Sequence, residues 1–274
     1  MLRATEFGDV VQYRLARTLA GRGRYWTAAY YVDGLLVDTG CRYSVRELVE
    51  ALADKPLERV VNTHAHEDHI GANQALLQQH PGLEILAHPA ALPVLEDPRR
   101  TQPLNPYQIL FWGYPAPSAG EAVSDAMMIE TNRFRLQVVF TPGHSVDHIC
   151  LYEPDQGWLF TGDLFVGGEI RALRSDSDVG QMVTSLKRVA ELPAEWLFPA
   201  SARARPNAAK ELAAKIAYFE ALEAKVLELH RRGRQVGEIA RGLLGGPTWV
   251  EFVTLGHFSR RNLVRSFLQA QERG

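Results

Sequence analysis

The chain has 274 residues, of which 46% are hydrophobic and 23% are charged, a composition ordinary for a globular protein. This length allows a core that needs no disulfide bonds, and two cysteines, Cys41 and Cys150, are too few for a disulfide framework. The N-terminus shows no apolar signal segment, and no apolar run reaches the roughly 18 residues of a membrane span. We therefore expect a cytoplasmic protein without a membrane partner.

The net charge of −2 is spread unevenly along the chain. Residues 203–274 carry 13 Lys/Arg and 7 Asp/Glu, whereas residues 1–202 carry 17 and 25. A basic tail can bind nucleic acid. Here the basic residues alternate with acids along predicted helices, which is typical of a solvated face. The pattern favours a small-molecule substrate over nucleic acid and leaves a homo-oligomer open.

The first part of the chain is predicted to alternate between strands and helices, as α/β layers do. Asp33-Gly34 separates two apolar runs and indicates a two-residue hairpin turn. Ser44 and Glu47 fit a capping box at the start of a helix. The expected strands cover 26–32, 35–38, 57–62 and 83–87, and the expected helices cover 45–53 and 71–80.

Residues 98–120 interrupt the alternation, because five prolines among these 23 residues exclude a long regular element. A loop of this length is either a binding loop or lid, or a surface loop anchored by Phe111 and Trp112. The sequence leaves both open. Further strands are expected over 133–140, 149–153, 158–160 and 195–198, with a helix over about 178–192 that Asp178 can cap.

The strongest chemical signal is the segment His64-Ala-His66-Glu-Asp68-His69, which follows the predicted strand 57–62. Two residues apart at the end of an extended strand, His64 and His66 can point to the same side. Asp68 and His69 follow in a turn before the next helix. Imidazole nitrogens and carboxylate oxygens are ligands that Zn²⁺ prefers. The spacing favours a metal site over a polar loop with incidental histidines.

Two more residues of ligand type follow later strands. His144 in Thr141-Pro-Gly-His144 follows strand 133–140, and Asp163 in Thr161-Gly-Asp163 follows strand 158–160. Folds of this class collect active sites at the carboxyl ends of their strands. Each residue alone would favour a structural role, but together with the first segment they predict one shared site. Its members are His64, His66, Asp68, His69, His144 and Asp163.

With these motifs the sequence resembles the metallo-β-lactamase superfamily over about residues 25–200. The matching segments are His64–His69, Pro142-Gly-His144 and Gly162-Asp163, with Asp38-Thr-Gly40 as a further match. The resemblance implies an α+β fold, a four-layer αββα sandwich with the metals at one edge of the paired sheets.

The resemblance also implies a division of the ligands between two divalent ions. One ion would be held by His64, His66 and His144 and the other by Asp68 and His69, with Asp163 between them. An aspartate at that bridging position is similar to the glyoxalase II and lactonase branches, whereas classical zinc β-lactamases often have cysteine there. We therefore expect an ester, thioester or lactone as the substrate rather than an antibiotic.

One position departs from the pattern of the family. The family usually supplies a last histidine ligand after a later strand, and Ser201 stands there in Phe198-Pro-Ala-Ser201. A neutral hydroxyl is a poor metal ligand, so a water fills the gap, another side chain enters, or the second site is weak or empty. His257 is one hypothetical substitute, although a lone histidine in an apolar stretch is more often structural.

After Pro206 the pattern becomes helical up to about residue 232, and helices over 235–244 and 259–271 follow, the last with Ser259 as N-cap. These residues resemble a small helical, winged-helix-like extension of some hydrolases with this fold. We therefore expect a catalytic domain over residues 1–205 and a helical extension over 206–274. A helix-turn-helix that binds DNA is a poorer fit.

The predicted chemistry is metal-assisted hydrolysis. A divalent ion, zinc first and iron or manganese otherwise, lowers the pKa of bound water from about 15.7 towards 7 and so supplies hydroxide. Asp68 and Asp163 are the predicted catalytic carboxylates, with Asp68 orienting the water or collecting a proton. Three rival functions stay open: a phosphodiesterase or nuclease that uses Arg203 and Arg205, a mono-iron redox or persulfide-handling enzyme, and a non-catalytic protein with a residual metal site.

Overall fold

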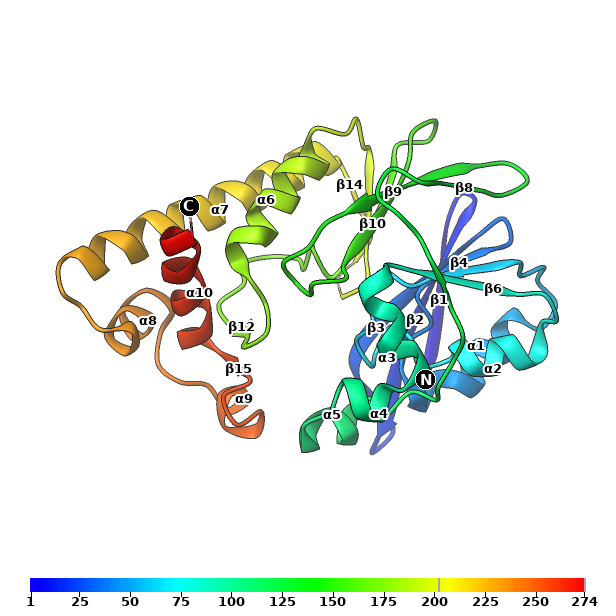
Figure 1. Ribbon diagram of the computed structural model, residues 1–274, viewed down its shortest axis with the longest axis horizontal. Coiled ribbons are helices and arrows are strands. Elements are labelled where there is room, and N and C mark those ends of the chain that lie inside the picture. Colours follow the sequence, from blue (N-terminus) through cyan, green and yellow to red (C-terminus); the bar gives the residue numbers. More distant parts are fainter. Residues whose placement is uncertain (202, 274) are drawn as a thin grey trace.

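The strands form two sheets that pack face to face (Figure 1). The computed structural model describes residues 1–201 and 203–273. The first sheet has seven strands in sequence order, antiparallel from β1 to β4 and parallel from β4 to β7. Its strands are β1 (Leu2–Phe7), β2 (Val10–Leu19), β3 (Arg22–Val32), β4 (Leu35–Val37), β5 (Arg59–Val61), β6 (Glu84–Ala87) and β7 (Glu121–Ala122).

The second sheet has six strands in the order β14-β13-β11-β10-β9-β8. Only β11 and β13 are parallel neighbours among these described strands. The strands are β8 (Met128–Glu130), β9 (Arg135–Phe140), β10 (Ile149–Glu153), β11 (Trp158–Gly162), β13 (Trp196–Pro199) and β14 (Arg205–Pro206).

Strand alternation divides the apolar side chains between the inside and the outside of the sandwich. Tyr30 on β3 points between the sheets, and its neighbour Tyr31 points to the outer face. Phe160 and Phe198, from the second sheet, pack against Tyr30 at centroid distances of 5.5 and 5.4 Å. The core between the sheets therefore joins β3 to the strands that carry the later motifs.

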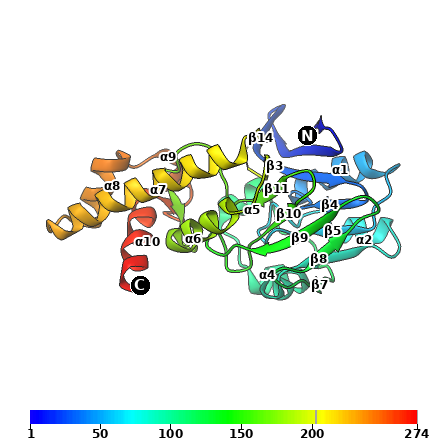
Figure 2. The same ribbon diagram turned by 90° about the horizontal axis from the view of Figure 1, so that it is seen from above.

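Helices cover both outer faces (Figure 2). On the first sheet, α1 (Val45–Leu52), α2 (Asn73–Gln79) and α3 (Leu92–Glu96) bury residues such as Leu48 and Leu76. On the second sheet, α6 (Val179–Ala190) and α7 (Ala208–Arg231) bury residues such as Leu186 and Leu212, and α10 (Arg260–Arg273) packs against these two helices. The predicted αββα sandwich is confirmed.

The helices of the C-terminal part pack beside the second sheet. The small helices α8 (Val236–Leu244) and α9 (Trp249–Val253) follow α7, and β15 (Phe258–Ser259) pairs with β12 (Leu173–Arg174) before α10. The remaining helical segments are α4 (Pro98–Thr101), α5 (Pro106–Phe111) and the 3₁₀ turns 42–44 and 89–91. Within residues 1–201 and 203–273, no helix combines the length and apolarity that a bilayer crossing requires.

Local signals placed most elements within a few residues of their observed bounds. The Asp33-Gly34 turn joins β3 to β4, with φ of 46° and 83° as a type I′ turn requires. Asp178 caps α6 by accepting from the Gln181 amide, and Ser259 accepts from the Asn262 amide at the start of α10. The predicted capping box at Ser44 is wrong, because the Ser44 hydroxyl donates back to the carbonyl of Cys41.

Candidate metal centre

The strand ends bring the predicted residues to one edge of the sandwich. Parallel pairing of β4 with β5 and of β11 with β13 places the carboxyl ends of these strands on the same side. The loops that leave these ends, together with the loop after β9, carry the chemistry-bearing side chains. These are Asp38 after β4, His64 to His69 after β5, His144 after β9, Asp163 after β11 and Ser201 after β13.

Three histidines form the first group of converging ligand atoms. One ring nitrogen from each of His64, His66 and His144 lies within 4.8 Å of the other two. The His66 Nδ1 and the His144 Nε2 are 3.0 Å apart. Three imidazole nitrogens that converge in this way are the ligand set of a tetrahedral zinc site with one open position.

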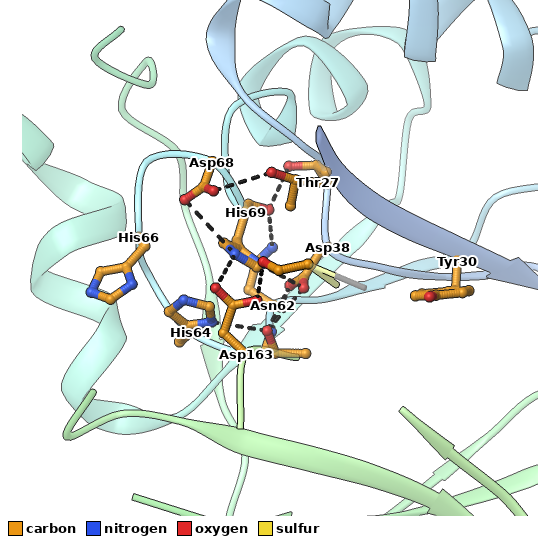
Figure 3. Close-up of polar contacts among 12 residues, drawn as sticks. Thr27, Tyr30, Asp38, Asn62, His64, His66, Asp68, His69 and Asp163 are labelled. Carbon is orange, nitrogen blue, oxygen red and sulfur yellow. Dashed lines mark hydrogen bonds and ion pairs between the residues drawn. The ribbon is translucent and has the colours of Figure 1, made fainter. Parts of the chain in front are cut away.

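A second group shares His64 with the first and adds His69 and Asp163. The Asp163 Oδ2 lies 3.6 Å from the His69 Nε2 and 3.7 Å from the His144 Nε2, so this carboxylate stands between the two groups. The Asp68 Oδ1 lies 3.8 Å from the His69 Nε2. Figure 3 shows Asp68 and Asp163 on either side of His69.

Hydrogen bonds fix which nitrogen of His64 and His69 faces the centre. The Asp38 carboxylate can only accept, so the His69 Nδ1, 2.8 Å away, carries the proton. The Thr63 hydroxyl donates to Asp38 and therefore accepts from the His64 Nδ1, 3.0 Å away. This arrangement leaves the Nε2 atoms of His64 and His69 directed at the centre, as in metal sites whose ligand rings are oriented by hydrogen bonds at the other nitrogen.

Those two Nε2 atoms are buried and have no hydrogen-bond partner in the part of the chain that the structure describes. Buried polar atoms are almost always paired, so two orphaned nitrogens that face one point indicate a missing ligand. The donor set fits a divalent cation: imidazole nitrogens and carboxylate oxygens around a shared centre.

The protonation states of His64, His66 and His144 suit a cation, whereas His69 must lose a proton before it can bind one. Burial lowers the pKa of His64 and His66 well below the ordinary value, and burial lowers the pKa of His144 to about 4. The three imidazoles are therefore neutral at pH 7, the form that binds metal. Burial also lowers the pKa of His69, but the neighbouring charges of Asp38 and Asp68 outweigh it and raise the pKa well above 6.5.

The two carboxylates of the site differ in their titration. Burial raises the pKa of Asp68 to about 6, and the Thr27 hydroxyl donates to its Oδ2 over 3.1 Å. Burial opposes ionisation of Asp163 as well, but His69 and His144 lower its pKa further than burial raises it. Asp163 is therefore ionised throughout the physiological range, whereas Asp68 titrates close to neutrality.

His148 holds the loop of Asp163 and does not face the centre. The backbone amide of Asp163 donates to the His148 Nε2, so the His148 Nδ1 carries the proton that goes to the Thr141 hydroxyl. In the same way, the Asp147 carboxylate accepts from the amide of Ala65. Sequence reasoning missed the roles of Asp38 and Asp147, although the Asp38-Thr-Gly40 match was a signal for the first.

Ser201 and His257 differ in their relation to the site. The Ser201 hydroxyl donates to the Asp163 Oδ1 over 2.6 Å, so it lies at the site and binds a carboxylate. His257 lies outside both groups of converging atoms. Its Nδ1 is 2.6 Å from the Tyr107 hydroxyl, and its Nε2 is 3.6 Å from the Asp176 carboxylate. The two groups thus contain five of the seven predicted ligands, and Asp68 lies beside them with its Oδ1 3.8 Å from the His69 Nε2, whereas His257 contacts none of the other six predicted ligands.

Comparison with known proteins agrees with this geometry. The sequence model of the metallo-beta-lactamase superfamily matches residues 27–201, and that range includes His64 to His69, His144 and Asp163. The chain belongs to this superfamily.

Relatives within the superfamily cover the chain to different extents. The hydroxyacylglutathione hydrolase of Gloeobacter violaceus is 33% identical over 153 residues, which are 55% of this chain and 52% of that protein. The chain thus spans about half the length of the curated relatives it matches.

Two solved structures share the fold well beyond the matched range. A metallo-beta-lactamase family protein from Thermus thermophilus aligns with a TM-score of 0.65 over 96% of this chain and 92% of its own, at 20% identity. A beta-lactamase domain protein from Burkholderia ambifaria aligns with a TM-score of 0.64 over 99% and 86%, at 17% identity. These alignments extend over the C-terminal helices.

Proposed function

We propose that this superfamily member is a metal-dependent hydrolase of an ester, thioester or lactone. The observation that carries the proposal is the pair of buried, unpartnered Nε2 atoms of His64 and His69 beside the Asp163 carboxylate, in the part of the chain that the structure describes. In this proposal His64, His66 and His144 hold the first ion. Asp68, His69 and Asp163 form a second, weaker half of the centre.

A divalent ion bound there supplies a Lewis acid and lowers the pKa of its water towards neutrality. The side chains of the chain then position the reaction and carry its protons. Asp68, with a pKa of about 6, takes a proton from the attacking water and returns it to the leaving group. The Thr27 hydroxyl holds the Asp68 carboxylate towards the centre while that proton moves.

A thioester is the substrate that the relatives support most directly. Their name, hydroxyacylglutathione hydrolase, describes the cleavage of an acyl group from the sulfur of glutathione. Each match covers only about half of the relative's length, so we propose the type of reaction alone and not the recognition of glutathione.

The proposed second half has three ligands instead of the usual four, because Ser201 binds Asp163. We infer that one ion binds tightly and that a second binds weakly or with water in the free position. Zinc is the first candidate for the tight ion, since three imidazoles and an open position suit it, and iron and manganese come next.

The test combines elemental analysis with hydrolysis of a thioester. The purified chain should hold at least one zinc, iron or manganese ion and hydrolyse S-acetyl-N-acetylcysteamine. The His66→Ala variant should lose both the ion and the activity, while His230→Ala, which changes an exposed histidine on α7, should keep both. Full hydrolysis by metal-loaded His66→Ala would refute the mechanism, and a chain without metal would be a non-catalytic protein.

The same experiment distinguishes a hydrolase from a redox enzyme or a nuclease. Iron as the sole metal, with oxygen consumption, would favour a redox enzyme. A nuclease needs a basic substrate face, and one of its two predicted residues is already engaged, because the Arg205 guanidinium pairs with the Glu211 carboxylate over 3.0 Å. Steeply salt-dependent binding of nucleic acid would nevertheless favour a nuclease.

A further inference from the structure

A cavity with aromatic walls is lined in part by α5, the helix whose Gln108 donates to Glu67 within the segment of candidate ligands. It has a volume of about 230 Å³ and forms between the β2–β3 hairpin, α5 with the residue that follows it, and α9. In Figure 1, α5 and α9 are neighbours at the lower edge of the molecule. We call it the aromatic cavity; its walls include Tyr25, Tyr107, Phe111, Trp112, Trp249 and Val253.

The lining of the aromatic cavity is almost wholly apolar, which is unusual next to a centre of histidines and carboxylates. Tyr25 and Phe111 pack with their ring centroids 4.3 Å apart, and Tyr25 contacts Trp112 at 5.7 Å. Trp249 closes the opposite wall, although 63% of its surface is exposed. Cavities with apolar walls and a few polar groups at one end are the usual form of small-molecule sites.

Two routes connect this cavity to the metal centre. Tyr107 contributes its ring to the wall, and its hydroxyl contacts His257, which in turn lies 3.6 Å from Asp176. Asp176 and His66 line the same neighbouring cavity. On the other side, Tyr25 precedes Thr27 by two residues on β3, and Thr27 bonds Asp68.

We propose that the aromatic cavity binds an apolar acyl or arylacyl group of the substrate while its carbonyl lies at the metal centre. This inference rests on the proposed hydrolase function and adds the substrate class to it. The volume exceeds the roughly 150 Å³ in which an apolar cavity binds benzene, so it accommodates a ring or a medium-length chain.

A substrate group explains the cavity better than a second copy of the chain does. A contact between copies needs an apolar face, whereas this recess is lined by several separate elements of one chain. Two wall residues also connect it to the reacting centre: the Tyr107 hydroxyl contacts His257, and Tyr25 lies two residues before Thr27, which donates to Asp68. Exposed Phe252 and Leu255 flank the recess without lining it, and they provide the control for the possibility of a dimer.

The experiment compares S-octanoyl- with S-acetyl-N-acetylcysteamine as substrates of the zinc-loaded protein. Each buried methylene improves binding by about fourfold, so kcat/KM should favour the octanoyl ester by at least about tenfold. Trp249→Ala should remove most of this preference by lowering kcat/KM for the octanoyl thioester towards the value for the acetyl thioester. Phe252→Ala, on the same helix but outside the lining, should keep the preference.

Binding of 1-octanol, followed by tryptophan fluorescence, tests the cavity without catalysis. Saturable binding of 1-octanol would support the inference if Trp249→Ala weakens it and Phe252→Ala does not. This holds even if neither thioester is hydrolysed, and in that case only the proposed function would fail. An equal preference in the wild type and Trp249→Ala would overturn it. A loss of dimers in Trp249→Ala without any change in preference would assign the cavity to a second copy and also overturn it.

Discussion

Replacing Ser201 by histidine tests how the chain sets the number of its ions. The Ser201 hydroxyl donates to Asp163 over 2.6 Å, and the proposed second half of the centre has only Asp68, His69 and Asp163 as ligands. Ser201→His would add an imidazole nitrogen at the end of β13. We expect a second ion to bind stoichiometrically to this variant, whereas the wild type holds it weakly.

The magnitude follows from the ligand count. Loss of a supporting partner in a metal site typically costs about 10- to 100-fold in affinity, and a direct ligand is worth at least as much. The second ion should therefore bind about 10- to 100-fold more tightly, or by about 1.4 to 2.8 kcal/mol. The loss of the hydrogen bond to Asp163 opposes this gain in part.

The assay is calorimetric titration of the metal-free protein with Zn²⁺, followed by elemental analysis after dialysis. Ser201→Ala is the matched control, because it removes the hydroxyl and adds no ligand. It should not gain the second ion. Equal stoichiometry and affinity in the wild type and Ser201→His would refute the reasoning that the serine limits the second site.

Three other perturbations follow from the same contacts. Because the pKa of His69 is raised well above 6.5, a second ion must expel the proton of His69, so the affinity for the second Zn²⁺ should rise with pH by up to about tenfold per unit below that pKa. His69→Ala should abolish this second binding step in a competition titration, and a wild-type affinity for the second ion that does not change with pH would contradict the assignment. Tyr30→Phe removes a buried hydroxyl that donates to the Pro199 carbonyl over 2.7 Å, so the free energy of unfolding should fall by about 1 to 3 kcal/mol in urea titrations, and an unchanged midpoint would count against it. Gly143→Ala places a Cβ 2.3 Å from the Met182 nitrogen at a φ of +130°, so the loop that carries His144 must shift. The metal content of this variant should drop, while circular dichroism shows that the fold is retained. Gly242→Ala, whose Cβ meets no neighbour among the described residues, is the control, and full metal content in Gly143→Ala would show that the loop adapts.

The sequence alone determined the features that depend on neighbouring residues. His64, His66, Asp68 and His69 fall within six consecutive positions, and an apolar strand precedes them. Both the candidate ligands and their place at a strand end could therefore be predicted. The hairpin at Asp33-Gly34 depends on two residues that tolerate positive φ. Short-range rules of this kind need no knowledge of the rest of the chain.

Other elements could not be predicted by those rules, and β1, β2 and α9 are examples. The first two strands, β1 and β2, precede residue 26, where the first expected strand begins, so the sequence analysis did not delimit them. The helix α9 was not predicted, because its five residues are too few to show an apolar stripe opposite a polar face. Its apolar residues Trp249, Phe252 and Val253 are all exposed.

Only the tertiary structure decided which distant side chains meet. Asp38 and His69 are 31 positions apart, Ser201 and Asp163 are 38 apart, and Tyr107 and His257 are 150 apart. No local propensity encodes such pairs, since they depend on how two sheets pack and on which strand ends share an edge. The sequence therefore indicates the candidate ligands of the centre, and packing decides their orientation, the partner of Ser201 and the existence of the aromatic cavity.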